Sequence, residues 1–239
     1  MADPERTARQ YDAMAADYSA DNAHNASNSL YERPATIALL GDVEGLHVLD
    51  AGCGAGLLSR WLLDHGAHVT AIDVSAQMAE LATREIGDRA TVLTADLSKP
   101  YEFAEDNRYD VIVSSLALHY IRDWGPVLSE FRRVLKTDGV VVFSTHHPFM
   151  DGPLHSPDDY FAIKQVTEEW EKGSGTYEVT FWRRPLTSMC ESIAQAGFVI
   201  ERLVEPMPLA ELEIRDPKMH SILSQQPTFL FFRLHPRRT

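Results

Sequence analysis

The sequence predicts an α/β fold of the doubly wound type, with a mostly parallel β-sheet between two layers of helices. Two observations lead to this class. From residue 46 onward, short apolar runs alternate with segments in which apolar residues recur at helical spacing. The first of these runs ends in a glycine-rich turn that leads directly into a helical segment. Because crossovers between parallel strands are right-handed, helices are expected on both faces of the sheet.

The central elements follow from this alternation. Strands are expected at residues 47–51, 68–73, 90–94, 109–114 and 140–145. Helices are expected between them, at residues 55–64, 75–86 and 124–135. Ser75 has the side chain and the position of an N-cap residue, and the third helix should end before Asp138-Gly139.

Two segments outside this core are expected to cover it. Residues 7–18 and 33–40 have helical spacing, with a polar stretch at 21–29 between them, which predicts a helical cap over residues 1–40. Residues 148–175 contain Pro148, Pro153, Pro157 and a Gly-Ser-Gly turn, which predicts an irregular insertion after the fifth strand. A long insertion of this kind is a candidate lid.

The rest of the chain alternates again. A strand is expected at residues 176–182, a helix at 186–196 closed by Gly197, and two final strands at 198–204 and 228–234. We therefore expect a single domain over residues 1–239, made of the cap (1–40), a central core (41–147), a lid (148–184) and a C-terminal segment (185–239).

Composition excludes several classes of protein. The chain has 239 residues, 44% hydrophobic and 24% charged, as expected of a globular domain. Its formal net charge of −13 disfavours nucleic acid as a partner, which Lys and Arg would have to bind. No apolar run reaches the roughly 20 residues of a membrane span, and the N-terminus lacks the apolar block of a secretory signal, so a cytoplasmic location is expected. Cys53 and Cys190 are too few for a disulfide framework or a zinc site, and no metal is expected.

The glycine-rich turn carries the strongest signal for a binding site. Gly52, Gly54 and Gly56 would let the backbone approach a ligand, and the helix that follows presents free N–H groups. Leu57 stands where the dinucleotide-binding pattern GxGxxG requires its third glycine. Asp50, two residues before the first glycine, suits a bound ammonium better than a pyrophosphate.

Carboxylates follow the next two predicted strands. Asp73 ends the second strand, 21 residues after Gly52, where a carboxylate commonly accepts hydrogen bonds from ribose hydroxyls. Asp96 follows the third strand, where it would accept a hydrogen bond from an adenine amino group, although a turn or helix-cap role is equally compatible with its position. Together these strand ends predict a site for an adenosine with a cationic tail.

These motifs resemble a known family. LDAGCGAG, AIDVS, TADL, VSSLALHYIRDW and EFRRVLKTDGVVVFSTHHPF are similar in kind and order to the motifs of class I S-adenosylmethionine-dependent methyltransferases over residues 45–147. Within that superfamily the chain most resembles the small-molecule group related to ubiquinone and menaquinone methyltransferases (methyltransferase type 11/25). The resemblance implies a seven-stranded Rossmann-like sheet with an antiparallel last strand, into which AQAGF and FLFFRL fit as terminal elements. It makes residues 41–147 the cofactor-binding core.

The resemblance also implies roles for individual residues. Asp50 and the glycine-rich turn would hold the methionine moiety of S-adenosyl-L-methionine, and Asp73 its ribose. Val74 and Met78 would contact the faces of adenine and residues 96–97 its edge, although a methionine at such a position is more often part of the core. The full candidate set for the cofactor is Tyr11, Tyr18, Asp50, Gly52, Cys53, Gly54, Gly56, Asp73, Val74, Met78, Asp96, Leu97 and Ser114. Tyr11 and Tyr18 are similar to the family's N-terminal aromatic cap, and their i, i+7 spacing fits helix packing equally well.

Three histidines are candidates for chemistry at the acceptor. His119 follows the fourth strand, and His146 and His147 end the fifth, so all three are expected near the carboxyl edge of the sheet. His119 and His146 are the candidate catalytic bases, since an imidazole accepts a proton near neutral pH. A structural role for His119 in ordering its loop is an equal alternative. His146 and His147 are adjacent on an extended segment, so at most one should face the substrate.

The methyl acceptor itself is expected to be a small molecule. Arg33, His147, Tyr160 and Trp182 are candidate substrate-binding residues, with surface exposure or packing within the lid as the plain alternatives. The product of the cofactor would be S-adenosyl-L-homocysteine, and the protein would be a monomer or homodimer.

Other functions compatible with these residues are a non-catalytic S-adenosylmethionine-binding protein and an NAD(P)-dependent oxidoreductase. Leu57 and Asp50 oppose the oxidoreductase. A nucleic-acid methyltransferase is disfavoured by the charge and by Ser114-Ser115-Leu116-Ala117 in place of an NPPY-like tetrapeptide.

Overall fold

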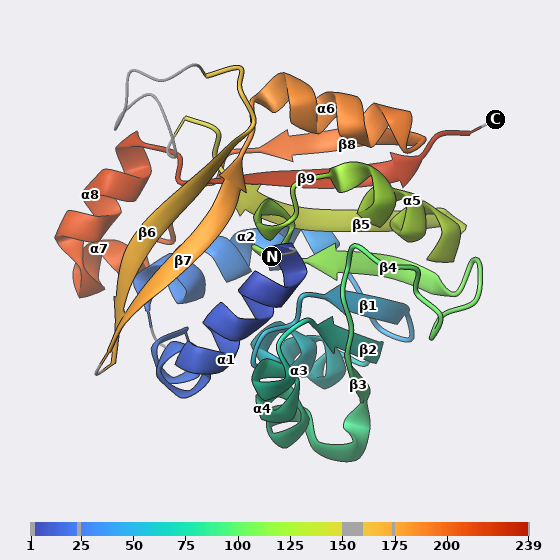
Figure 1. The fold of residues 1–239 in the computed structure, drawn as a ribbon, viewed down its shortest axis with the longest axis horizontal. Coiled ribbons are helices and arrows are strands. Elements are labelled where there is room, and N and C mark those ends of the chain that lie inside the picture. Colours follow the sequence, from blue (N-terminus) through green and yellow to red (C-terminus); the bar gives the residue numbers. More distant parts are fainter. Residues whose placement is uncertain (1–2, 23–24, 150–159, 174, 239) are drawn as a thin grey trace.

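A seven-stranded sheet forms the centre of the molecule in the computed structural model, which describes residues 3–22, 25–149, 160–173 and 175–238 (Figure 1). Its strands are β1 (His47–Ala51), β2 (His68–Asp73), β3 (Thr91–Thr94), β4 (Tyr109–Ser114), β5 (Leu135–His146), β8 (Phe198–Val204) and β9 (Phe229–Pro236). Their order is β3-β2-β1-β4-β5-β9-β8. All neighbours up to β5 pair in parallel, and β9 runs antiparallel to both β5 and β8. The predicted doubly wound sheet with an antiparallel last strand is confirmed.

Side chains along the central strands point alternately to the two faces of the sheet, which produces two separate apolar cores. On β5, for example, Val140 and Val142 face one apolar layer, while Val141 and Phe143 face the other. One layer is covered by α5 (Trp124–Val134) and α6 (Leu186–Gln195). The other is covered by α2 (Arg33–Leu40), α3 (Leu57–Asp64), α7 (Glu211–Arg215) and α8 (Pro217–Gln225). A strand with apolar side chains on both faces is the pattern expected of a buried parallel sheet.

Helix boundaries agree closely with those that the sequence predicts. α4 (Ala76–Ile86) starts after Ser75, whose hydroxyl accepts a hydrogen bond from the Met78 N–H at 3.1 Å, so the predicted N-cap is confirmed. α5 starts after Asp123, which caps it by accepting from the Gly125 N–H at 2.9 Å. Short helical turns η2 (Gly87–Arg89) and η3 (Leu118–Tyr120) complete the central part.

The first helix of the N-terminal cap is longer than the segment 7–18 that the sequence predicts, and the cap lies over the carboxyl edge of the sheet. α1 spans Asp3–Asn22, and the π-helical turn η1 (Asn28–Glu32) leads directly into α2. In Figure 1, α1 lies between α4 and the hairpin formed by β6 (Lys164–Lys172) and β7 (Gly175–Arg183). The paired strands of this hairpin form a separate two-stranded sheet.

The prediction of an irregular insertion over residues 148–175 is wrong for its second half, which forms β6. The strand is rich in Glu and Lys because most of its side chains are exposed, so the alternation that marks a half-buried strand is weak there. Pro153 and Pro157, which favoured an irregular loop, lie outside the described residues. Helices α7 and α8 were likewise not predicted.

No helix within the described part of the chain combines the length and the apolar character that crossing a bilayer requires.

The double-layered core makes a prediction about stability. Ile112 on β4 is fully buried, whereas Ile214 on α7 is 88% exposed. Replacing Ile112 with Ala should lower the free energy of unfolding by about 2–5 kcal/mol, because it leaves a cavity in the core. The same replacement at Ile214 should change it by less than about 0.5 kcal/mol. Urea unfolding of both variants measures the difference, and equal effects would contradict the assigned core.

Candidate functional site

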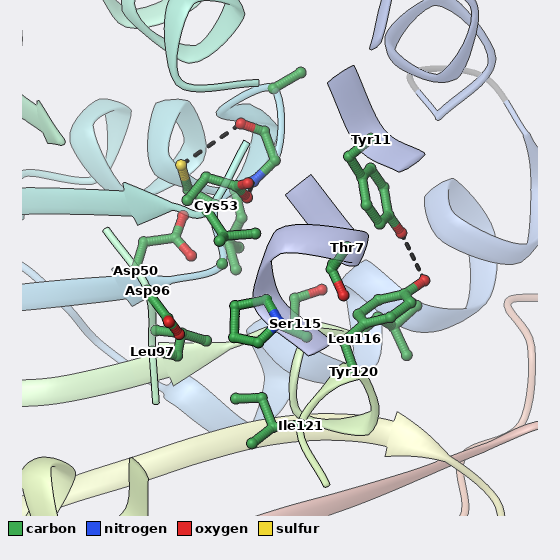
Figure 2. Close-up of a pocket in the computed structure, with 18 of the residues that line it drawn as sticks. Thr7, Tyr11, Asp50, Cys53, Asp96, Leu97, Ser115, Leu116, Tyr120 and Ile121 are labelled. Carbon is green, nitrogen blue, oxygen red and sulfur yellow. Dashed lines mark hydrogen bonds between the residues drawn. The ribbon is translucent and has the colours of Figure 1, made fainter. Parts of the chain in front are cut away.

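A cavity of about 280 Å³ opens at the carboxyl ends of the first four strands. It is bordered by the turn after β1, the ends of β2 and β3, the segment after β4, and the cap elements α1 and η1. In the view of Figure 2, Asp50 and Asp96 lie on one side of this cavity and Thr7, Tyr11 and Tyr120 on the other. Open α/β sheets bind ligands at this edge, where the order of the strands reverses between β1 and β4.

The turn after β1 requires glycine at two positions. Gly52 has a φ of +87°, and a Cβ there would lie 2.4 Å from the Cβ of Ala117. Gly56 has a φ of +85°, and a Cβ there would lie 3.0 Å from the Cα of Ala82 on α4. The Gly52 N–H also donates to the carbonyl of Ile72 at 2.8 Å, which fixes the turn to β2. Gly52 therefore borders the cavity without a side chain, and Gly56 allows the turn to pack closely against α4.

Asp50 is a buried carboxylate on β1. The Ser59 hydroxyl donates to its Oδ2 at 2.5 Å, while Oδ1 is buried and receives no hydrogen bond from the described residues. Burial raises the pKa of Asp50 to about 7; the Ser59 hydrogen bond opposes this shift, and the charges of Asp73 and Glu32 add to it. A cation bound in the cavity would stabilise the charged form of Asp50.

Asp73 joins the glycine-rich turn to the end of β2. Its Oδ2 accepts a hydrogen bond from the Gly54 N–H at 2.8 Å, and its Oδ1 accepts one from the Ser75 N–H at 2.9 Å. Burial raises the pKa of Asp73 to about 6, and the two N–H groups oppose the shift. Each oxygen has a second lone pair, so both remain able to accept a hydrogen bond from a ligand hydroxyl.

The segment after β3 borders the same cavity. Asp96 accepts hydrogen bonds at Oδ1 from the N–H and the hydroxyl of Ser98, at 2.8 and 2.7 Å. Leu97 and Val74 line the cavity beside it. The structure therefore brings residues from three strand ends together, as the sequence predicts, together with Cys53 and Gly54 of the turn.

Aromatic side chains from the cap lie across the cavity from these carboxylates. The hydroxyls of Tyr11 and Tyr120 are hydrogen-bonded at 2.7 Å (Figure 2). The rings of Tyr11 and Tyr18 meet edge to face with their centroids 5.2 Å apart. Burial raises the pKa of Tyr11 well above its ordinary value and that of Tyr18 to about 12, so both phenols are neutral. The two tyrosines thus pack with each other and line the cavity.

Hydrogen bonds hold α1 in this position from both sides. Asp12 accepts from the Ser75 hydroxyl at 2.5 Å, which attaches α1 to the start of α4. The Tyr177 hydroxyl donates to Asp17 at 2.9 Å, which attaches α1 to β7. The cap therefore covers the cavity as a fixed element in this structure.

Glu32, at the end of η1, is a cavity residue that sequence analysis missed. Three hydroxyls donate to its Oε1: those of Thr36 and Ser115 at 2.8 Å each, and that of Ser144 at 2.6 Å. These donors are 4, 83 and 112 positions away in the chain, so no local pattern marks the site. Sequence analysis singled out the next residue, Arg33, as a candidate substrate residue, but not Glu32.

Three residues predicted to bind the cofactor are not on the cavity. Gly56 packs against α4, where a Cβ would lie 3.0 Å from the Cα of Ala82. Met78 is fully buried with Ala15 and Ala55, between α1 and α4, so the prediction that it contacts adenine is not supported. Ser114 is also fully buried, and its hydroxyl donates to the Ala51 carbonyl at 2.7 Å, which ties β4 to β1. The next residue, Ser115, lines the cavity in its place. A single step along an extended segment reverses the side chain, which sequence alone did not resolve.

The histidines predicted to act as bases lie beside the cavity rather than on it. His119 is buried, and its ring stacks on that of His146 with centroids 3.9 Å apart, with Phe181 at the edge of both rings. Burial, with the nearby His146 and Arg184, lowers the pKa of His119 well below its ordinary value. His147 points elsewhere and is hydrogen-bonded to Glu205 at 2.8 Å. This placement corrects the catalytic assignment of His119 and His146 and the substrate assignment of His147.

The remaining residues predicted to bind the substrate lie in different places: one of them lines the cavity and two do not. Arg33 lines the cavity and donates to the Asn22 carbonyl at 3.3 Å, and burial lowers its pKa. Tyr160 accepts a hydrogen bond from the Leu186 N–H at 3.2 Å, and Trp182 lies under the guanidinium of Arg122. Neither of these two aromatic residues borders the cavity, so the expected aromatic wall of the lid is not formed by them. The tyrosines of the cap occupy that role.

The sequence of the chain is similar to those of known methyltransferases. The family "Methyltransferase domain" matches residues 49–143. A malonyl-[acyl-carrier protein] O-methyltransferase of Salmonella typhimurium is 36% identical over 188 residues, which cover 72% of this chain and 73% of that protein. An uncharacterized protein of Haemophilus influenzae is 28% identical over 227 residues, covering 86% and 87% of the two chains.

A solved structure supports the same assignment. The S-adenosylmethionine-dependent methyltransferase from Mesorhizobium loti superposes with a TM-score of 0.70 at 26% identity, covering 89% of this chain and 99% of that one. The fold, the strand-end carboxylates and these similarities agree. The chain belongs to the S-adenosylmethionine-dependent methyltransferases, and S-adenosyl-L-methionine is its cofactor.

Proposed function

We propose that this protein transfers a methyl group from S-adenosyl-L-methionine to a small-molecule acceptor, with release of S-adenosyl-L-homocysteine. The observation that supports this most is the convergence of Asp50, Asp73 and Asp96, from three successive strand ends, on one cavity with the glycine-rich turn. A cavity of about 280 Å³ is near the lower end of the range for small-molecule sites. It suits a cofactor and a compact acceptor.

The residues present fit the cofactor. Asp50 has a buried carboxylate oxygen without a described partner, which a bound ammonium would satisfy. Asp73 would accept hydrogen bonds from the ribose, and residues 96–97 with Val74 would border the adenine. The backbone of Gly52, Cys53 and Gly54 would approach the methionine moiety, as the absence of side chains at the two glycines allows.

When bound, the cofactor supplies an electrophilic methyl group on a sulfonium, open to in-line displacement by the acceptor. The protein's task is to align the acceptor and to keep water out, since both lower the barrier and prevent stray reaction. Helix α1 performs the second task in this proposal, because Asp12 and Asp17 attach it over the cavity. Proton removal is assigned to neither His119 nor His146, because they lie outside the cavity lining.

A second acceptor class deserves testing because of the relatives. The Salmonella typhimurium relative is named for a malonyl group on acyl-carrier protein, so a carrier-bound carboxylate is the alternative acceptor. Acidic residues outnumber basic ones around the cavity, which favours a free small molecule without a carboxylate at the reacting end.

Asp73 provides a direct test of the proposed cofactor site. Asp73→Ala should weaken binding of S-adenosylhomocysteine by about 1.5–3 kcal/mol, because two hydrogen bonds to the ribose are lost. Isothermal titration calorimetry measures the change, and Asp88→Ala, at an exposed position after α4, is the matched control. Unchanged affinity of the Asp73 variant would contradict the assignment.

The raised pKa of Asp50 predicts a pH dependence of binding. A cationic ligand requires the charged carboxylate, so affinity should rise as Asp50 loses its proton through a pKa of about 7. Between pH 5.5 and 7.5 the association constant for S-adenosylhomocysteine should increase by about 25-fold through Asp50 alone. Asp73, with a pKa of about 6, contributes in the same direction at the lower end. In Asp50→Asn the rise above pH 6.5 should disappear; a rise that persists there would exclude Asp50 as its source.

A further inference from the structure

The buried carboxylate of Glu32 is the feature of the cavity that cofactor binding does not use. Glu32 is only 3% exposed, and it lines the cavity. All three hydrogen bonds that it receives from the described residues go to Oε1, which leaves Oε2 with none from them. Oε2 therefore keeps its full capacity to accept a hydrogen bond from a ligand that enters the cavity.

The position of Glu32 places it on the acceptor half of the site. The proposed cofactor residues Asp73 and Asp96 follow β2 and β3, on one side of β1. The hydroxyls that hold Glu32 belong to Ser115, which follows β4, and Ser144, on β5, on the other side of β1. Glu32 therefore lies over the half of the sheet that the adenosine does not cover.

Backbone strain at Leu116 supports a role in ligand binding for the region around Glu32. Leu116 has a φ of +50°, in the left-handed region that a branched side chain rarely adopts. Its N–H donates to the Ser144 hydroxyl at 2.9 Å, and that hydroxyl in turn donates to Glu32. Strain of this kind persists where surrounding contacts fix it, and it gathers at binding sites. Leu116 itself lines the cavity.

The charges and rings around the cavity favour a cation beside Glu32. Five carboxylates line it against two guanidinium groups: Glu32, Asp50, Asp73, Asp96 and Asp123, with Arg33 and Arg122. The charge of Glu32 also raises the pKa of both Asp50 and Tyr18, which shows that it acts within the same space. The rings of Tyr18 and Tyr120 border that space as well, and aromatic faces bind ammonium groups.

On the basis of the proposed function, we infer that Glu32 determines which acceptor the protein binds. The acceptor carries an amine, and the N–H groups of its cationic form, an ammonium, donate to the Glu32 carboxylate. A carboxylate at the same place would be repelled by Glu32. Arg33, the next residue, also lines the cavity; its guanidinium donates to the Asn22 carbonyl at 3.3 Å and interacts with the charge of Glu32. The inference thus favours amines over the carboxylate class to which the malonyl relatives point.

The test uses the intact protein saturated with S-adenosylhomocysteine, so that Asp50 and Asp73 are occupied. Three amines and three carboxylates of the same shape serve as probes: propylamine, benzylamine and phenethylamine against butyrate, phenylacetate and 3-phenylpropionate. Ligand-observed NMR titration measures their binding. We expect at least one amine to bind at least tenfold more tightly than its matched carboxylate. Equal binding, a preference for carboxylates, or no amine binding would overturn the inference.

Glu32→Gln separates this inference from the cofactor site. The variant keeps the shape of the side chain and removes its charge, so amine binding should fall at least tenfold while affinity for S-adenosylhomocysteine stays within threefold. Glu205→Gln, the same change at a carboxylate that bonds His147 away from the cavity, should alter neither. Retained amine binding in Glu32→Gln would refute the role of Glu32. Failure of wild-type protein to bind S-adenosylhomocysteine would instead refute the proposed function. If Glu32→Gln does not fold, the probe preference of the wild type still decides.

Discussion

The candidate functional site depends on one constraint: several carboxylates are buried at one edge of the parallel sheet, away from water. Asp50, Asp73 and Glu32 are held there by hydroxyl and N–H donors rather than by cationic side chains. Such donors stabilise a buried carboxylate only in part, so the raised pKa values of Asp50 and Asp73 record an unmet need for a counter-charge. In the proposed function, the ammonium group of S-adenosyl-L-methionine would supply a counter-charge to Asp50.

The central fold was predictable because local and global patterns agree in it. The strands at 47–51, 68–73 and 109–114 were predicted to the residue, since buried parallel strands are continuous apolar runs bounded by turns. The strand-end carboxylates were found for the same reason: they occupy fixed positions after such runs. The hairpin strand β6 was missed because it pairs only with β7, outside the central sheet, and its many exposed charged side chains conceal its period.

The outer part of the site was less predictable because tertiary contacts create it. Glu32 is held in the cavity by Thr36, four residues away, and by two donors from distant positions, Ser115 and Ser144. Met78 and Ser114 leave the cavity by facing the other side of their elements. His119 sits in the right segment of the chain, but its ring turns into an aromatic cluster with His146 and Phe181. Position along the sequence places a residue near the edge of the sheet, and only packing decides where its side chain points.

The attachments of α1 also bear on how the molecule assembles. Gln10, Asp12 and Asp17 belong to the first part of the chain to be synthesised, yet their partners Thr180, Ser75 and Tyr177 lie up to 170 positions later. Contacts across such separations form late, because the intervening chain must first be ordered. On the ribosome, α1 can contact α4 before β7 emerges, but its attachment on the second side has to wait for β7. A chain truncated before residue 177 would lack the Tyr177 contact, so α1 would be held over the cavity from one side only.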